Sequence, residues 1–217
     1  MGIDTTVFAG RPTKWDGLLD WLQMLSGAAL ILFIWAHMLL VASVIIGPGV
    51  MNAIAGFFEA TGLAQVGGPL IFLLFLGHFL LAARKVPFRF DRQKTFWSHA
   101  TMLHHQDTWL WLVQVVTAML LLLMGTIHMW VVLTDLPITA AKSAEVLQKR
   151  SGWLLFYLLF GPLVHVHLGI GLYRIGVKWG FVGKEGRARF KRFVTILVLV
   201  CVGLSLLTLL RFSFLAI

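Results

Sequence analysis

Five long apolar runs, separated by polar or charged stretches, divide the chain. A helix needs about 20 apolar residues to cross a bilayer, so only the second run is short. It either begins earlier, in the stretch GGPLIF, or packs inside a bundle. None of the runs has the alternation of a membrane barrel. The pattern predicts an all-α polytopic membrane protein, a bundle of five transmembrane helices in one integral membrane domain over 1–217. The spans cover about residues 21–46, 69–84, 108–133, 153–177 and 193–212.

The stretches outside these runs refine the picture. Residues 1–20, MGIDTTVFAGRPTKWDGLLD, are polar and mixed, without the basic region and short apolar core of a signal peptide. Residues 47–68 are apolar for a loop and contain a single acid, Glu59. We therefore expect part of this loop to form a short helix along the membrane surface.

The composition agrees with a membrane protein, and the charges indicate its orientation. Hydrophobic residues make up 59% of the chain and charged residues only 12%, against about a quarter in soluble domains. Of the 18 Lys and Arg residues, 14 lie in segments 1–20, 84–107 and 174–192, which share one side of a five-span topology. The positive-inside rule predicts a cytoplasmic N-terminus and an outside C-terminus, in the inner (cytoplasmic) membrane. This topology explains the net charge of +9 without a nucleic-acid partner.

The motifs that the sequence lacks exclude several cofactors. Cys201 is the only cysteine, so the chain has too few thiolates for an iron–sulfur or zinc site of its own. There is no CxxCH motif for c-type haem attachment and no glycine-rich nucleotide motif. Any haem is therefore expected to bind without c-type attachment.

Four of the apolar runs contain a histidine, and these histidines lie at two depths. His37 and His128 are 16 and 20 residues from the inner ends of their runs, or about 24 and 30 Å along a helix. His78 and His167 lie six and seven residues before the next inner arginine, or about 10 Å from the inner end. Two imidazoles at one depth on facing helices are what axial ligation of a haem iron requires. The depths predict two b haems, one held by His37 and His128 and one by His78 and His167.

Intramembrane histidines can also have other roles. A single intramembrane histidine more often hydrogen-bonds a neighbouring helix, but four histidines sorted into two depths favour haem ligation. A transporter with a histidine proton relay is the alternative, and the absence of Asp and Glu from the runs argues against it. On depth alone, His165 could replace His167, but residues two apart on a helix cannot ligate one iron together. No chemistry is assigned to the remaining histidines, His99, His104 and His105.

The sequence resembles a known family along nearly its whole length: the five-helix, dihaem cytochrome b subunit of quinol:fumarate reductases and related succinate dehydrogenases. The segment HLGIGLYRIGVKWG at 167–180 is the most specific. The resemblance implies haem ligands at His37, His78, His128 and His167, and so favours His167 over His165. The other matching segments are DWLQ at 20–23, WAHMLLVASVIIG at 35–47, HFLLAARKVP at 78–87, HQDTWLWLVQ at 105–114 and GTIHMW at 125–130.

The resemblance also implies partners and a reaction. The subunit would anchor a flavoprotein subunit and an iron–sulfur subunit on the cytoplasmic face, and a dimer of such complexes is compatible with it. Electrons would pass between menaquinone or menaquinol in the lipid bilayer and the partners, which carry the fumarate and succinate chemistry. The resemblance is compatible with either direction, fumarate reduction or succinate oxidation. A dihaem cytochrome b of a hydrogenase or formate dehydrogenase is the alternative, although the basic inner segments favour an inward partner.

Four further residues receive roles from the resemblance. Glu59 would accept protons from quinol near the outer haem; otherwise it is a solvated loop carboxylate. Gln23, Trp111 and Lys178 would bind haem propionates, although Lys178 also fits the positive-inside pattern and Trp111 fits an interfacial aromatic belt. The sequence departs from the family at His165, where some members have a Glu linked to transmembrane proton movement. An imidazole can relay protons, but its charge logic is opposite to that of a carboxylate.

Overall fold

The computed structural model describes residues 13–86 and 89–217. In these two ranges the chain forms helices and no strands. Short 3₁₀ segments at Ser43–Ile45 (η2) and Lys184–Gly186 (η3) adjoin two of the helices. The helices are α1 (Lys14–Ala42), α2 (Pro48–Ala60), α3 (Leu63–Ala83), α4 (Phe90–Leu103), α5 (Gln106–Thr134), α6 (Ala140–Lys149), α7 (Trp153–Lys178) and α8 (Arg187–Ser213).

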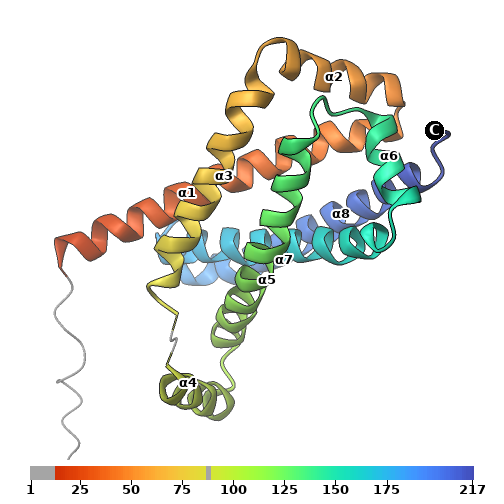
Figure 1. The fold of residues 1–217 in the computed structure, drawn as a ribbon. Coiled ribbons are helices and arrows are strands. Elements are labelled where there is room, and N and C mark those ends of the chain that lie inside the picture. Colours follow the sequence, from red (N-terminus) through yellow and green to blue (C-terminus); the bar gives the residue numbers. More distant parts are fainter. Residues whose placement is uncertain (1–12, 87–88) are drawn as a thin grey trace, which may run out of the picture.

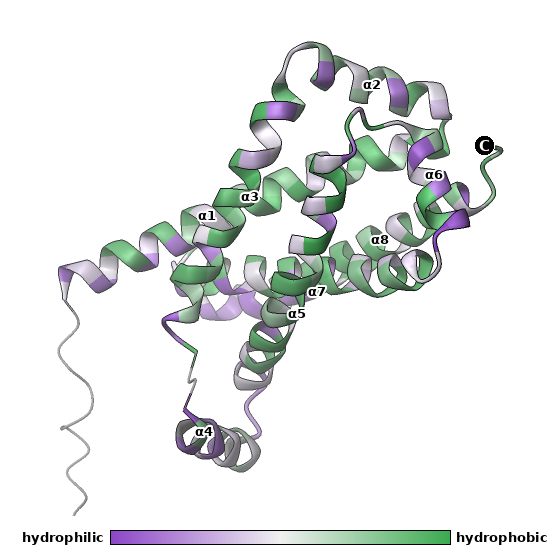
Figure 2. Ribbon diagram, in the orientation of Figure 1, coloured by the Kyte–Doolittle hydropathy of each residue, from purple (hydrophilic) through white to green (hydrophobic). Residues whose placement is uncertain are grey.

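Five of the described helices are long and apolar enough to cross a membrane, which confirms the predicted five-span architecture. They are α1, α3, α5, α7 and α8. Hydrophobic residues predominate along them, whereas hydrophilic residues gather in shorter helices such as α4 and α6 (Figure 2). Large apolar side chains on the outer faces of the long helices are exposed, as a lipid-facing surface requires; examples are Leu32, Leu73, Leu123, Leu155 and Leu199.

Three spans begin six or seven residues earlier than the apolar runs suggest: α1 at Lys14, α3 at Leu63 and α8 at Arg187. Local caps explain the first two. Thr13 and Asp16 form a capping box that starts α1 at Lys14 rather than near residue 21. Gly62 has a φ of 74° and turns the chain from α2 into α3, which begins at Leu63. The second span is therefore 21 residues long and includes the stretch GGPLIF.

Four spans form a closed ring. α1 contacts α3, α3 contacts α5, α5 contacts α7, and α7 contacts α1, while α8 packs mainly against α7. The long helices cross one another obliquely, and α4 lies beyond the first turns of α5 (Figure 1). The four histidine-bearing spans are therefore the four ring members, and the span without a histidine lies outside the ring.

One end of the bundle is closed by short elements, and we call it the capped end: η2, α2, α6 and residues 213–217. Its side chains form a buried cluster that contains Val44, Met51, Ala140, Ala144 and Phe212. Hydrogen bonds tie the pieces together, from the Ala140 amide to Asn52 Oδ1 (2.8 Å) and from Gln148 Nε2 to the carbonyls of Phe212 and Leu215. The helix expected in loop 47–68 is α2, which forms part of this cap.

Small residues allow α7 and α8 to pack closely. A Cβ built on Gly176 would lie 2.5 Å from Phe190 Cε1, and one built on Gly169 would overlap the Val198 side chain. Both glycines are buried, so neither site has room for a larger residue.

We therefore predict that Gly176→Leu destabilises the subunit by about 1–3 kcal/mol, because the new side chain overpacks the α7–α8 contact. Gly203→Leu on α8 is the matched control, since a Cβ there meets nothing within 4 Å. The measurement is the Tm of each purified variant in detergent. Equal Tm values for the two variants would contradict the packing described here.

Candidate functional site

A large cavity runs through the ring of helices. Its volume is about 870 Å³, within the usual range for ligand pockets, and apolar side chains from α1, α3, α5 and α7 make up most of its wall. His37, His78, His128 and His167 all line it. The structure thus brings the four predicted haem ligands to one apolar space.

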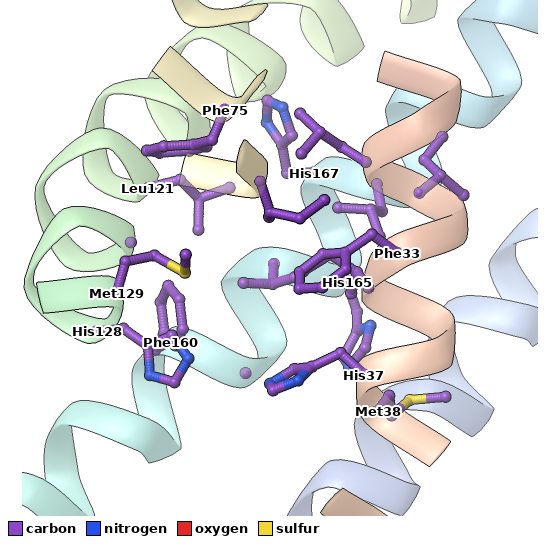
Figure 3. Close-up of a pocket in the computed structure, with 18 of the residues that line it drawn as sticks. Phe33, His37, Met38, Phe75, Leu121, His128, Met129, Phe160, His165 and His167 are labelled. Carbon is purple, nitrogen blue, oxygen red and sulfur yellow. The ribbon is translucent and has the colours of Figure 1, made fainter. Parts of the chain in front are cut away.

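His37 and His128 face each other across this cavity (Figure 3). Their ring centroids are 6.1 Å apart. A metal–imidazole bond is about 2 Å long and a ring centre lies roughly 1 Å from its nitrogens, so two imidazoles on one metal ion have centres about 6 Å apart. His37 also stacks on Phe33, with the ring centroids 5.6 Å apart. This spacing fits two axial ligands.

His78 and His167 contact the opposite walls of the same ring. His78 Nδ1 lies 2.9 Å from the hydroxyl of Ser26 on α1. His167 Nδ1 lies 2.9 Å from the hydroxyl of Thr117 on α5, and its Nε2 lies 3.3 Å from Gln114 Nε2. Each histidine therefore has a hydroxyl partner on the helix next to its own.

These contacts place the two histidine pairs in separate layers. On α1, Ser26 marks the level of His78, and His37 follows 11 residues later. On α5, Thr117 marks the level of His167, and His128 also follows 11 residues later. Eleven helical residues rise about 16 Å, so the same offset on both walls separates the layers by about three turns.

The structure separates His165 from His167. His165 is buried, and its Nε2 lies 2.8 Å from the hydroxyl of Ser205 on α8, outside the ring. His167 instead faces Thr117 and Gln114 on α5. Of the two histidines, only His167 is bonded to a helix of the ring.

The end of the cavity nearest His78 is basic, and we call it the basic end: Asp20, Arg84, Lys85 and Lys178. Asp20 pairs with all three cations, with Lys178 Nζ 2.6 Å and Lys85 Nζ 2.5 Å from its oxygens. Partial burial lowers the pKa of Lys85 below its usual value, and the hydrogen bond to Asp20 opposes this shift. The positively charged residues at the C-terminal ends of α3 and α7 therefore lie together at this end.

The three residues proposed for propionate binding also line the cavity. Lys178 belongs to the basic end and lies 5.4 Å from the centre of the Trp179 ring. Gln23 Oε1 is buried and has no hydrogen-bond partner among the described residues. Trp111 packs against Phe96 of α4, with the ring centroids 4.4 Å apart and the ring planes tilted by 52°. The structure therefore brings Gln23, Trp111 and Lys178 to one cavity, as a shared role requires.

Glu59 lines the cavity from the capped end. Gln65 Nε2 donates a hydrogen bond to Glu59 Oε2 at 2.7 Å. The other oxygen, Oε1, is buried and has no hydrogen-bond partner in the described part of the chain. Lys142 and Asp135 also line the cavity, and their ion pair holds the pKa of Asp135 below its usual value. Glu59 is thus not a freely solvated loop carboxylate, which was the alternative to a role in quinol oxidation.

The donor set suits a group that needs few protein ligands. Within residues 13–86 and 89–217, no three or more His, Cys, Asp or Glu side chains gather as a metal site would require. His37 and His128 instead face each other as a pair, and His165, which also lines the cavity, bonds Ser205. A macrocycle needs only a pair of protein ligands. An apolar wall, paired imidazoles and a basic end together match a haem with its carboxylates.

Comparisons with known proteins show the family of this chain. A family model described as the succinate dehydrogenase/fumarate reductase transmembrane subunit matches residues 91–207. The fumarate reductase cytochrome b subunit of Wolinella succinogenes is 32% identical over 211 residues, which cover 91% of this chain and 82% of the relative. This chain belongs to that family of transmembrane subunits. The fumarate reductase cytochrome b subunit of Helicobacter pylori strain J99 is 34% identical over 208 residues, which cover 88% of this chain and 81% of the relative.

Several residues around the site of this cytochrome b membrane subunit were not predicted from the sequence. The hydroxyl partners Ser26 and Thr117 are two of them, and Tyr157 is a third, because its hydroxyl lies 3.1 Å from His128 Nδ1. Gln65 and Asp20 are the others. Helical spacing gives a weak signal for the first two, since Ser26 and Thr117 each lie three residues after a cavity glutamine.

Gly27 makes room for the ring of His78. A Cβ built on Gly27 would lie 3.0 Å from His78 Cε1. Since the branched side chain of valine adds two further methyl groups, we predict that Gly27→Val displaces the ring and reduces the haem b content by one per chain. The measurement is the pyridine haemochrome spectrum of the purified protein. Gly17→Val on the same helix is the control, because its Cβ meets nothing within 4 Å; full haem content in both variants would contradict the prediction.

Proposed function

We propose that this cytochrome b membrane subunit carries electrons across the membrane, between a quinol site at its capped end and partner subunits at its basic end. Two histidine pairs in one cavity that reaches from Glu59 to Lys178 carry the proposal. The names of the relatives support fumarate reductase over a hydrogenase or formate dehydrogenase as the parent complex.

The ligands proposed for the two haems follow from the layers. His37 and His128 would hold the haem nearer the capped end, and His78 and His167 the haem nearer the basic end. Hydroxyl groups occupy Nδ1 of His78 and His128, so Nε2 is the nitrogen assigned to iron in each. Haem b bound at both pairs would supply one-electron transfer along the cavity.

Glu59 is the residue proposed to act on quinol. A quinol that loses two electrons must also release two protons, and a carboxylate at the reacting oxygen can accept them one at a time. Oε1 of Glu59, which has no hydrogen-bond partner among the described residues, could accept these protons. Phe58 and Leu63 make the surrounding cavity wall apolar. Menaquinol, which the sequence resemblance favours, is the proposed substrate.

The basic end is the proposed exit toward partner subunits. Lys178, Gln23 and Trp111 would hold haem propionates there, with Lys178 exchanging its contact to Asp20 for a propionate or sharing it. A flavoprotein subunit and an iron–sulfur subunit would dock on this face, which the positive-inside rule assigns to the cytoplasm. The N-terminus then lies inside and the C-terminus outside the inner membrane.

Paired substitutions test the assignment of the ligands. We predict that His128→Ala lowers the haem b content from two per chain to one, because it removes one of the two residues that would hold the haem nearer the capped end. His37→Ala should remove the same spectral component, so the double variant His37→Ala/His128→Ala should lose nothing more. His78→Ala combined with His128→Ala should lose both haems. The measurements are the pyridine haemochrome ratio and the reduced-minus-oxidised spectrum.

The matched control is His165→Ala, a buried intramembrane histidine bonded to α8 instead of the ring. It should keep both haems. If His128→Ala removes the component that His78→Ala removes, and keeps the one that His37→Ala removes, the proposed pairing is wrong.

A single atom change tests Glu59. We predict that Glu59→Gln keeps both haems but lowers the rate of quinol oxidation at least a hundredfold, because an amide cannot accept the proton. The measurement is haem reduction by a soluble naphthoquinol in the purified complex. Glu145→Gln, an exposed acid of the cap outside the cavity wall, is the control. A near-normal rate in Glu59→Gln would dismiss this carboxylate as the proton acceptor.

A further inference from the structure

At the corner between α2 and α3, the side chain of Gln65 contacts Glu59. Gln65 lies in the first turn of α3, and its amide donates to Glu59 Oε2 at 2.7 Å. The two residues are six positions apart and belong to different helices. The hydrogen bond therefore spans the corner and depends on the geometry of the turn.

The turn is built to bring these side chains together. Only Thr61 and Gly62 separate α2 from α3, and Gly62 adopts a left-handed φ of 74°. The Gly62 amide donates to the Glu59 carbonyl at 3.1 Å, and the Thr61 hydroxyl donates to the Phe57 carbonyl at 2.8 Å. Backbone bonds thus fix the last turn of α2, which carries Glu59.

The two carboxylate oxygens of Glu59 have unequal surroundings. Oε2 accepts the amide proton of Gln65, whereas Oε1 is buried without a hydrogen-bond partner among the described residues, in a side chain that lines the cavity. A neutral amide can fix the orientation of a carboxylate without neutralising its charge. It therefore leaves Oε1 able to accept a proton, which a lysine or arginine partner would oppose.

We propose that Gln65 is a positioning residue for quinol oxidation, which clamps Glu59 so that Oε1 faces the quinol hydroxyl. This inference rests on the proposed function of Glu59. The proton that leaves the quinol oxygen goes to Oε1, while Oε2 keeps its bond to the amide. Gln65 itself touches neither the quinol nor the reacting atoms.

The test compares two substitutions of Gln65 in the purified complex, with a soluble naphthoquinol as the substrate. In Gln65→Leu the donor is lost, so kcat should fall about tenfold, while KM and both haem spectra stay unchanged. In Gln65→Glu the new side chain has the same size and donates only when protonated. Its kcat should therefore recover, relative to Gln65→Leu, as the pH is lowered.

Thr61→Val is the matched control, since it removes a hydrogen bond from the same corner but none from Glu59. It should keep kcat within about twofold of the unmodified protein. The inference is overturned if Gln65→Leu keeps its kcat, or if Thr61→Val loses as much. Failure of the proposed function is seen separately, as a near-normal rate in Glu59→Gln.

Discussion

An imidazole inside a membrane must satisfy two ring nitrogens without water, and the arrangement of this bundle follows from that constraint. His78, His128 and His167 each place one nitrogen against a hydroxyl on another helix: Ser26, Tyr157 and Thr117. Such contacts fix both the helix that each ring faces and the depth at which it lies. Ser26 precedes His37 on α1 by as many residues as Thr117 precedes His128 on α5. The two histidine layers are therefore separated by the same distance along both helices.

The same constraint explains where the bundle is tightly packed. The ring of α1, α3, α5 and α7 surrounds a cavity, so its inner faces cannot supply a continuous apolar core. Close packing occurs instead at the capped end, around Met51 and Phe212, and along α7 and α8, where Gly169 and Gly176 let the helices approach. α8 thus supports α7 from outside the ring without contributing a histidine.

Hydropathy and helical spacing predicted the coarse features, because membrane thickness and a 1.5 Å rise leave few alternatives. The starts of α1 and α3 differed from the apolar runs because they depend on Thr13 and on the left-handed Gly62. The hydroxyl groups that contact the histidines could not be predicted from the sequence, for another reason. Thr117 bonds a carbonyl of its own helix as well as His167, whereas the Thr126 and Thr208 hydroxyls bond their own helix carbonyls. No single-sequence pattern separates a threonine that supports a histidine from one that serves its own backbone.

Two of the carboxylates that line the cavity, Asp20 and Glu59, show how its ends differ. Asp20 is shared by Arg84, Lys85 and Lys178, so a proton bound there would have to compete with three cations. Glu59 meets one neutral amide, and its second oxygen has no described partner. A group that releases protons would thus meet an acceptor at the capped end, and an anionic group would meet positive charge at the basic end. In the proposed function, a quinol would bind at the capped end of the cavity and a haem propionate at the basic end, and electrons would travel the length of the cavity between them.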